Sequence, residues 1–232
     1  MIDTGYLELV PISDLVPHEE IVEEKIGSLK ADVLRDEFLQ HPIVCYRTSQ
    51  NYIVLDGHHR FRVIGSLGLA VAPVQVVSRE QITLSYWYHV IHNSVSKLNG
   101  ISMDFQEGHV CTCGSDEGHC FKIPRVKSID IDEQIWSIFN LYGQSRYTRV
   151  GQVTENYRWV TFNGLTFDEI IELAVQGRVV PSDVTRFLIK YRILNLKVPL
   201  SILVNQSEAR FNEIRRKLKS ARVYEEPTIW IE

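Results

Sequence analysis

One stretch of sequence constrains the fold more than any other, because it joins an apolar run to a helical pattern through a single glycine. Ile53-Val-Leu55 is typical of a buried strand, and from His58 onward apolar residues recur at helical spacing, as Phe61 and Ile64 show. Gly57, between the two patterns, can adopt backbone angles that other residues avoid. The sequence therefore predicts a strand that passes directly into a helix.

The same junction carries the polar groups expected of a phosphate site. Free N–H groups at the start of a helix, with the positive end of the helix dipole behind them, attract phosphate oxygens. His58, His59 and Arg60 add side-chain donors in the first turn, and Asp56 at the strand end is suited to hold a divalent ion against the phosphates. Because ionisable groups cluster at functional sites, we interpret the junction as a phosphoryl-handling site rather than a plain turn before a solvated helix.

The composition is that of an ordinary globular chain. With 232 residues, 44% of them hydrophobic, it allows one large domain or two small ones that share a cleft. The net charge of −4 argues against nucleic acid as a partner of the whole chain. No apolar run has the length of a membrane span, and the first residues lack the pattern of a signal peptide, so we expect a cytoplasmic protein without a membrane partner.

The order of the predicted elements indicates an α+β fold in two parts. Strands and helices over residues 1–80 form one compact unit, and residues 81–232 form a second α+β domain, with a cleft between the two. The aromatic-rich run at 82–92 is typical of a core, an interface or the wall of a small-molecule pocket. Residues 93–128 are predicted to be an irregular loop, and a final basic helix is predicted at about 207–221.

A cluster of soft metal ligands lies within the predicted loop, at Cys111, Cys113, His119 and Cys120. A Cys-x-Cys pair with an adjacent His-Cys pair is not the usual Cys-x₂-Cys knuckle of a zinc site, and the chain has a single such cluster. We therefore expect a surface loop here rather than a metal centre.

Two parts of the chain resemble a known family. Ile53–Phe61, preceded by Val16-Pro17-His18-Glu19, is similar to the ParB/sulfiredoxin-type fold as it occurs in free L-serine kinases, and the archaeal ADP-dependent serine kinase is a relative of that group. In the second half, Val184–Phe187, Arg192 and Val198–Leu200 resemble the bacterial members found with siderophore biosynthesis. The segment 93–128 lies outside the resemblance.

The resemblance implies a ParB/sulfiredoxin-like first domain and a kinase that transfers phosphate from ATP or ADP to free L-serine. By resemblance, Glu19 is the general base for the serine hydroxyl, and Asp56 acts in catalysis close to Mg²⁺. Three further sets are implied: Gly57, His58, His59 and Arg60 for the nucleotide phosphates, Asp56 for the metal, and Trp87, Thr185 and Arg186 for the amino acid. A better match to the bacterial branch favours ATP as the donor.

Several alternatives stay open at this point. A ParB-like DNA-binding regulator would use the basic residues of the helix at 207–222, but the chain has a net negative charge and lacks a recognisable helix-turn-helix. A nucleotide hydrolase on the same fold is possible, whereas a sulfiredoxin-like reductase needs a cysteine in the phosphate turn, and residues 56–60 contain none. Homoserine or threonine could also be the acceptor, since one methyl or methylene group gives only about 1–3 kcal/mol of discrimination.

Overall fold

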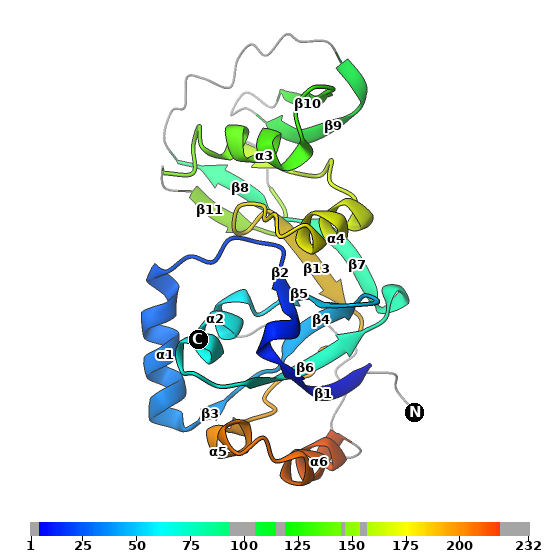
Figure 1. Cartoon of the computed structure of the whole chain (residues 1–232). Coiled ribbons are helices and arrows are strands. Elements are labelled where there is room, and N and C mark those ends of the chain that lie inside the picture. The colour runs from blue at the N-terminus through cyan, green and yellow to red at the C-terminus, as the bar shows by residue number, and fades with distance from the viewer. Residues whose placement is uncertain (1–4, 93–104, 115–118, 145–146, 154–156, 219–232) are drawn as a thin grey trace.

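The structure, a computed structural model, describes residues 5–92, 105–114, 119–144, 147–153 and 157–218 (Figure 1). Its first half is built on a five-stranded mixed sheet with the order β1-β6-β4-β5-β2. The strands are β1 (Tyr6–Pro11), β2 (Leu15–Pro17), β4 (Ile43–Arg47), β5 (Tyr52–Asp56) and β6 (Val71–Val77). β6 is buried along its whole length, so this sheet forms the centre of the first unit.

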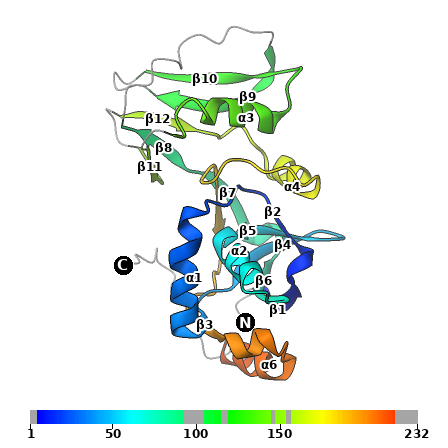
Figure 2. The same cartoon turned by 60° about the vertical axis from the view of Figure 1, so that its left-hand side comes forward.

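The predicted strand-to-helix junction is confirmed. β5 ends at Asp56, and α2 (His58–Ser66) begins two residues later, with Gly57 between them at φ 98°. This left-handed angle favours glycine, and a Cβ there would lie 2.7 Å from Arg60 Nη2. α1 (Glu24–Asp36) runs beside α2 (Figure 2). Two short 3₁₀ turns, Ile12–Asp14 and Arg79–Gln81, complete the helical segments of this unit.

The end of the described chain returns to the first unit. β14 (Val198–Pro199) pairs with β3 (Phe38–Leu39), and α5 (Leu200–Val204) and α6 (Glu208–Lys217) lie below the first sheet in Figure 1. Phe211 of α6 is fully buried in the same core as the sheet. The domain boundary expected near residue 80 stays a prediction, but the first core also contains residues from 193–214.

A second five-stranded sheet, wholly antiparallel, forms the other unit, with the order β10-β9-β12-β8-β11. Its strands are β8 (Tyr88–Ile91), β9 (Phe105–Gly114), β10 (Cys120–Val126), β11 (Tyr147–Val150) and β12 (Arg158–Thr161). Two helices, α3 (Ile131–Phe139) and α4 (Phe167–Val175), accompany it. Thr166 and Glu169 form a capping box at the start of α4.

Two strands connect the units. β7 (Ile82–Tyr86) pairs antiparallel with β13 (Thr185–Ile189), and Thr185 lies opposite Tyr86. Figure 1 shows this ribbon between the two sheets. The start of β13, with Thr185 and Arg186, is thereby placed at the border between the units, opposite the end of β5.

The expectation of an irregular loop at 93–128 is wrong for the two strands that the structure describes there. β9 and β10 pair antiparallel, and Cys111 and Cys113 are buried in the second core, while Cys120 is exposed. The alternating run of Val, Cys and Thr is compatible with a strand, but pairing with β10 and β12 decides it. In the described part of the chain, no group of three or more His, Cys, Asp or Glu side chains is arranged to hold a metal ion.

Two further features follow from the sequence only in part. The predicted last helix is observed as α6, which ends at Lys217, and its predicted part from 219 onward lies outside the described residues. The short helix α5 before it is not predicted by the sequence pattern.

None of the described helices is long and apolar enough to cross a membrane.

We predict that Phe211→Ala destabilises the first unit by about 3–5 kcal/mol, because it removes a fully buried ring from the core and leaves a cavity. Urea unfolding followed by fluorescence measures this loss. The matched control is Val204→Ala in α5, whose side chain is 63% exposed and whose loss should change stability by no more than about 0.5 kcal/mol. Equal stability of both variants would show that α6 is not part of the first core.

Candidate active site

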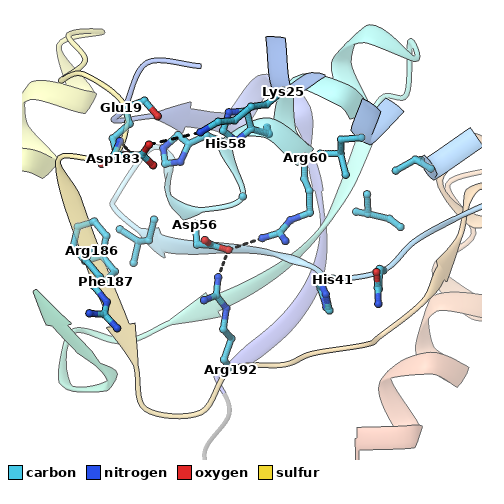
Figure 3. A pocket seen from close by; sticks show the side chains of 18 of the residues that line it. Glu19, Lys25, His41, Asp56, His58, Arg60, Asp183, Arg186, Phe187 and Arg192 are labelled. Atoms are coloured by element: carbon cyan, nitrogen blue, oxygen red, sulfur yellow. Dashed lines mark hydrogen bonds and ion pairs between the residues drawn. The ribbon is translucent and has the colours of Figure 1, made fainter. Parts of the chain in front are cut away.

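A cavity of about 850 Å³ lies where the two units meet. The first unit lines it with the end of β2, with α1 and with the β5–α2 junction. The second lines it with Trp87, Arg149 and the segment 182–192. Figure 3 shows charged side chains from both units pointing into this space. Every site residue predicted from the sequence lies in its wall: Glu19, Asp56, Gly57, His58, His59, Arg60, Trp87, Thr185 and Arg186.

Glu19 is held by the backbone of the second unit. Its Oε1 accepts hydrogen bonds from Thr185 N at 2.8 Å and from Thr185 Oγ1 at 2.6 Å, and its Oε2 accepts one from Asp183 N at 3.3 Å. A parallel bridge between Glu19 and Val180 fixes the main chain beside it. Because burial disfavours the carboxylate more than these hydrogen bonds favour it, the pKa of Glu19 is raised to about 7. A carboxyl group with this pKa suits general base catalysis near neutral pH.

Asp56 is paired with two arginines. Its Oδ2 accepts from Arg60 Nη2 at 2.5 Å and from Arg192 Nη2, and Figure 3 shows the carboxylate between the two guanidinium groups. Burial by itself favours the neutral acid, but the charges of Arg60 and Arg192 outweigh it and hold the pKa of Asp56 below its usual range. The Arg60 contact has the i, i+4 spacing of a helical pair, whereas the Arg192 contact depends on the tertiary fold.

The start of α2 presents two side-chain nitrogens that lack partners. His59 Nε2 and Arg60 Nε are buried without a hydrogen bond in the part of the chain that the structure describes. Both residues line the cavity, beside the first N–H groups of α2. Buried polar atoms are normally paired, so the missing partner of these two nitrogens is best explained by an anionic ligand of the cavity.

His58 differs from its neighbour. Its side chain is buried, and its Nε2 lies 3.2 Å from His18 Nδ1, which points it toward the protein interior. Burial, and then the nearby His18, lower the pKa of His58 well below its usual value, so this ring is neutral. Of the two histidines predicted to bind phosphate, His59 is the one with a nitrogen available for it.

Trp87 contacts two guanidinium groups. The Arg149 and Arg186 guanidinium carbons are 4.6 Å and 4.4 Å from its ring centroid. Arg149 also pairs with the Asp183 carboxylate, whereas the contact with the ring leaves the N–H groups of Arg186 available to an anion. Thr185, by contrast, has its hydroxyl group bonded to Glu19 and to His18. Trp87 and Arg186 are therefore placed to contact a carboxylate directly, while Thr185 acts mainly on Glu19.

Asp183 is a site residue that the sequence does not reveal. It adopts φ 68°, and its carboxylate pairs with Lys25 Nζ at 3.6 Å and with Arg149. The buried His89 lies 2.8 Å from its carbonyl oxygen through Nε2, which therefore donates to it. Asp183 thus joins α1 to β11 across the cavity. The sequence carries no local signal that Lys25, Arg149 or Asp183 lines the site, and Arg192 belongs only to the pattern of the family resemblance.

Glu19 makes a pH-dependent contribution to stability. Its pKa is about 7 in the folded protein against an ordinary value of 4.5, so the folded state binds the proton more tightly. The resulting stabilisation is complete below pH 4.5 and is lost as the pH rises to 7. We predict that Glu19→Gln, which never ionises, gains stability over the wild type across this range, by at most about 3 kcal/mol.

Thermal unfolding of both proteins at pH 5 and pH 8 measures this difference. The exposed neighbour Glu20, changed to Gln, is the matched control and should show no such pH dependence. A stability gain of Glu19→Gln that is equal at both pH values would contradict the raised pKa.

The chain is similar to known proteins along most of its length. No protein-family model matches the chain. It is 28% identical over 219 residues to the ATP-dependent L-serine kinase SbnI of Staphylococcus aureus, covering 85% of this chain and 84% of that protein. It is 25% identical over 227 residues to an ATP-dependent L-serine kinase of Staphylothermus marinus, covering 84% of this chain and 90% of that protein.

Solved structures show the same fold. SbnI with a C-terminal truncation matches with a TM-score of 0.77 and 25% identity over 92% of this chain and 96% of that chain. A free serine kinase variant in complex with ADP matches with a TM-score of 0.66 and 17% identity over 85% and 93% of the two chains. Fold and site define a two-part α+β protein with a cavity lined by charged side chains from both units. Along most of its length, the chain is similar to free L-serine kinases, SbnI among them.

Proposed function

We propose that this protein transfers a phosphoryl group from ATP to the hydroxyl group of free L-serine and so forms O-phospho-L-serine. One observation carries the proposal: a carboxyl group with a pKa near 7, Glu19, faces the same cavity as the unpartnered donors at the start of α2. A base and a phosphate site in one cavity are the two parts that phosphoryl transfer to an alcohol needs. The L-serine kinases among the relatives supply the substrate and the donor of the proposal.

The nucleotide phosphates bind at the β5–α2 junction. Gly57 lets the chain turn there, the first N–H groups of α2 face the cavity, and His59 and Arg60 add side-chain donors. Arg192 is a further phosphate ligand, because its pairing with the Asp56 carboxylate places its guanidinium group at this junction. Phosphate oxygens compete with that carboxylate for Arg60 and Arg192, so nucleotide binding releases Asp56.

Magnesium fits this arrangement. Mg²⁺ in kinases is commonly bound by substrate phosphates together with one or two carboxylates, and Asp56 is the carboxylate at this junction. When bound, the ion neutralises charge on the transferring phosphoryl group.

The amino acid occupies the part of the cavity beside Trp87. The Arg186 guanidinium group, held against the Trp87 ring, pairs with the serine carboxylate, and Arg149 lies on the same ring. The Asp183 carboxylate pairs with Arg149 and Lys25, and the ammonium group of a zwitterion can take the place of Lys25 in this pair. Glu19 accepts the hydroxyl proton as the new P–O bond forms, a contribution of about 10²–10⁴-fold to the rate.

The choice of donor rests on the relatives, and three further parts of the proposal rest on the sequence resemblance. ATP is the preferred donor because the curated relatives named above are ATP-dependent. A ParB/sulfiredoxin-like first domain, a function linked to siderophore biosynthesis and a cytoplasmic location are proposed on the sequence resemblance. The DNA-binding alternative has one observation in its favour, the basic residues Arg215, Arg216 and Lys217 at the end of α6. A DNA-binding function gives no role to the Glu19 carboxyl group or to the unpartnered nitrogens of His59 and Arg60 in the cavity.

We predict that Glu19→Gln lowers phosphoserine formation by at least about 100-fold, because the hydroxyl proton then has no acceptor. Phosphorus NMR of the protein with ATP, magnesium and L-serine measures the product directly. ATP binding, followed by calorimetry, should stay within a few-fold of the wild type. Turnover of the variant at the wild-type rate would remove Glu19 from the role of base, and consumption of ATP without L-serine would indicate a hydrolase.

We predict a different result for Asp56→Asn. Loss of this negative charge frees Arg60 and Arg192 for phosphate, so the affinity for ATP without magnesium should stay equal or rise. Magnesium-dependent turnover should nevertheless fall, by roughly 100-fold or more, since the metal loses its carboxylate. The exposed Asp168→Asn in α4 is the matched control for the change in charge. A loss of ATP affinity with full turnover would contradict both roles of Asp56.

A further inference from the structure

Asp183 is a residue through which the second unit contacts the proposed base. Its N–H group donates to Glu19 Oε2 at 3.3 Å, and its carbonyl oxygen accepts from His89 Nε2 at 2.8 Å. Its carboxylate pairs with Lys25, as Figure 3 shows, and with Arg149. The residue has φ 68°, a left-handed angle that an L-amino acid other than glycine keeps where several contacts impose it. These contacts therefore set the direction in which the Asp183 N–H group points.

Two of the contacts come from one cross-strand pair of the second sheet. His89 of β8 lies directly opposite Arg149 of β11 in the antiparallel register. Side chains at opposite positions of antiparallel strands point to the same face of the sheet. From this face His89 binds the carbonyl oxygen of Asp183, and Arg149 binds its carboxylate. The sheet thus holds both the backbone and the side chain of Asp183.

The His89 ring is itself fixed by two tyrosines. It is fully buried, stacks on Tyr147 with ring centroids 4.5 Å apart, and lies 2.7 Å from the Tyr142 hydroxyl group through Nδ1. Burial lowers the pKa of His89 below its ordinary value, so the ring is neutral near pH 7 and carries one hydrogen. The Asp183 carbonyl can only accept, so this hydrogen is on Nε2, and the Tyr142 hydroxyl donates to Nδ1. The ring is therefore held in one orientation and one tautomer.

The chain is anchored on both sides of Asp183. Before it, Val180 N donates to the His18 carbonyl oxygen at 3.0 Å. After it, β13 begins at Thr185, whose N–H group donates to Glu19 Oε1 at 2.8 Å. Without a donor on the Asp183 carbonyl, the backbone between these anchors can relax from the left-handed angle, and the Asp183 N–H group then turns away from Glu19.

We infer that His89 is a positioning residue for the base: it holds the Asp183 carbonyl oxygen and so keeps the 183–185 segment in the conformation that binds Glu19. The same hold, together with Arg149, places the Asp183 carboxylate for the ammonium group of the amino acid. Because His89 is fully buried, it acts through Asp183 and not by contact with a substrate. The inference rests on the proposed function of Glu19 as a base.

The first test is the kinetics of His89→Leu, which fills the space with an apolar side chain and removes the donor. Because a small displacement of a catalytic group is costly, we expect kcat to fall by about 10–100-fold. KM for L-serine should rise, since the Asp183 carboxylate loses its position. The dissociation constant of ATP should stay within about threefold, because the phosphate site belongs to the first unit. An unchanged kcat, or a loss of ATP affinity as large as the loss in kcat, would overturn the inference.

The matched control is His92→Leu. His92 directly follows β8, is exposed, and contacts Thr148 at the surface. Its replacement should leave kcat and both KM values at the wild-type level. A loss equal to that of His89→Leu would show a general effect of changes in this region and would contradict a specific role of His89.

Two amide variants keep the test valid if His89→Leu fails to fold. The Gln side chain is long enough to place an N–H group where His89 Nε2 lies, whereas the Asn amide reaches only as far as Nδ1. We therefore expect His89→Gln to keep most of the wild-type kcat and His89→Asn to lose it as His89→Leu does. Equal kcat values in the two amide variants would exclude a role for the bond to the Asp183 carbonyl.

Hydrogen exchange of the free protein gives a readout that needs no substrate. The Thr185 amide donates to Glu19, and we expect it to exchange about tenfold faster in His89→Asn but not in His89→Gln. Amides of β12, which pairs with β8, should exchange as in the wild type. Faster exchange throughout β12 would show that His89 only supports the second sheet and would overturn the inference.

Failure of the proposed function and failure of this inference give different results. A wild type that forms no phosphoserine removes the proposed function, and the role of His89 toward the base with it. An active wild type whose kcat and Thr185 exchange rate are both retained in His89→Asn removes only the role of His89.

Discussion

The contact between Glu19 and the backbone of residues 183–185 is the interaction on which the site depends. Glu19 belongs to the first unit, and the two N–H groups that hold it belong to the second. The same segment of the second unit also carries Arg186, and it pairs through β13 with β7. Because this carboxylate joins the two units, its position and the shape of the cavity are coupled, and a shift of either unit would change both.

A second constraint is the balance of charge in the cavity. Asp56 lies between Arg60 and Arg192, and Asp183 lies between Lys25 and Arg149. Each acid keeps two cations in place when no anion is bound. A phosphate or a carboxylate can take over these cations with little rearrangement, because their positions are already fixed. This arrangement suits an enzyme that must bind a nucleotide and a zwitterion side by side.

The two halves of the site differ in how far the sequence predicts them. The β5–Gly57–α2 junction follows from local pattern, whereas the ion pair between Asp56 and Arg60 across it is not predicted by the sequence. Glu19, Trp87, Thr185 and Arg186 follow from a family resemblance, which homology to SbnI supports at the level of the family. Lys25, Arg149 and Asp183 follow from neither, since each gains its role only from partners that are distant in the chain. His18 looks, in the sequence, like an ordinary polar residue, and only the tertiary structure shows that it is buried beside Thr185.

Local sequence therefore determined the elements that a few neighbouring residues can specify: a strand, a glycine with a left-handed angle, and a helix start with its donors. The tertiary structure decided which of these elements meet. It brought β13 to Glu19, returned α6 to the first core, and formed strands from the 105–114 and 120–126 segments. The physical reason is that periodicity and capping act over a few residues, whereas the contacts of Glu19 and Asp183 in the cavity join residues that are 34 to 166 positions apart in the chain.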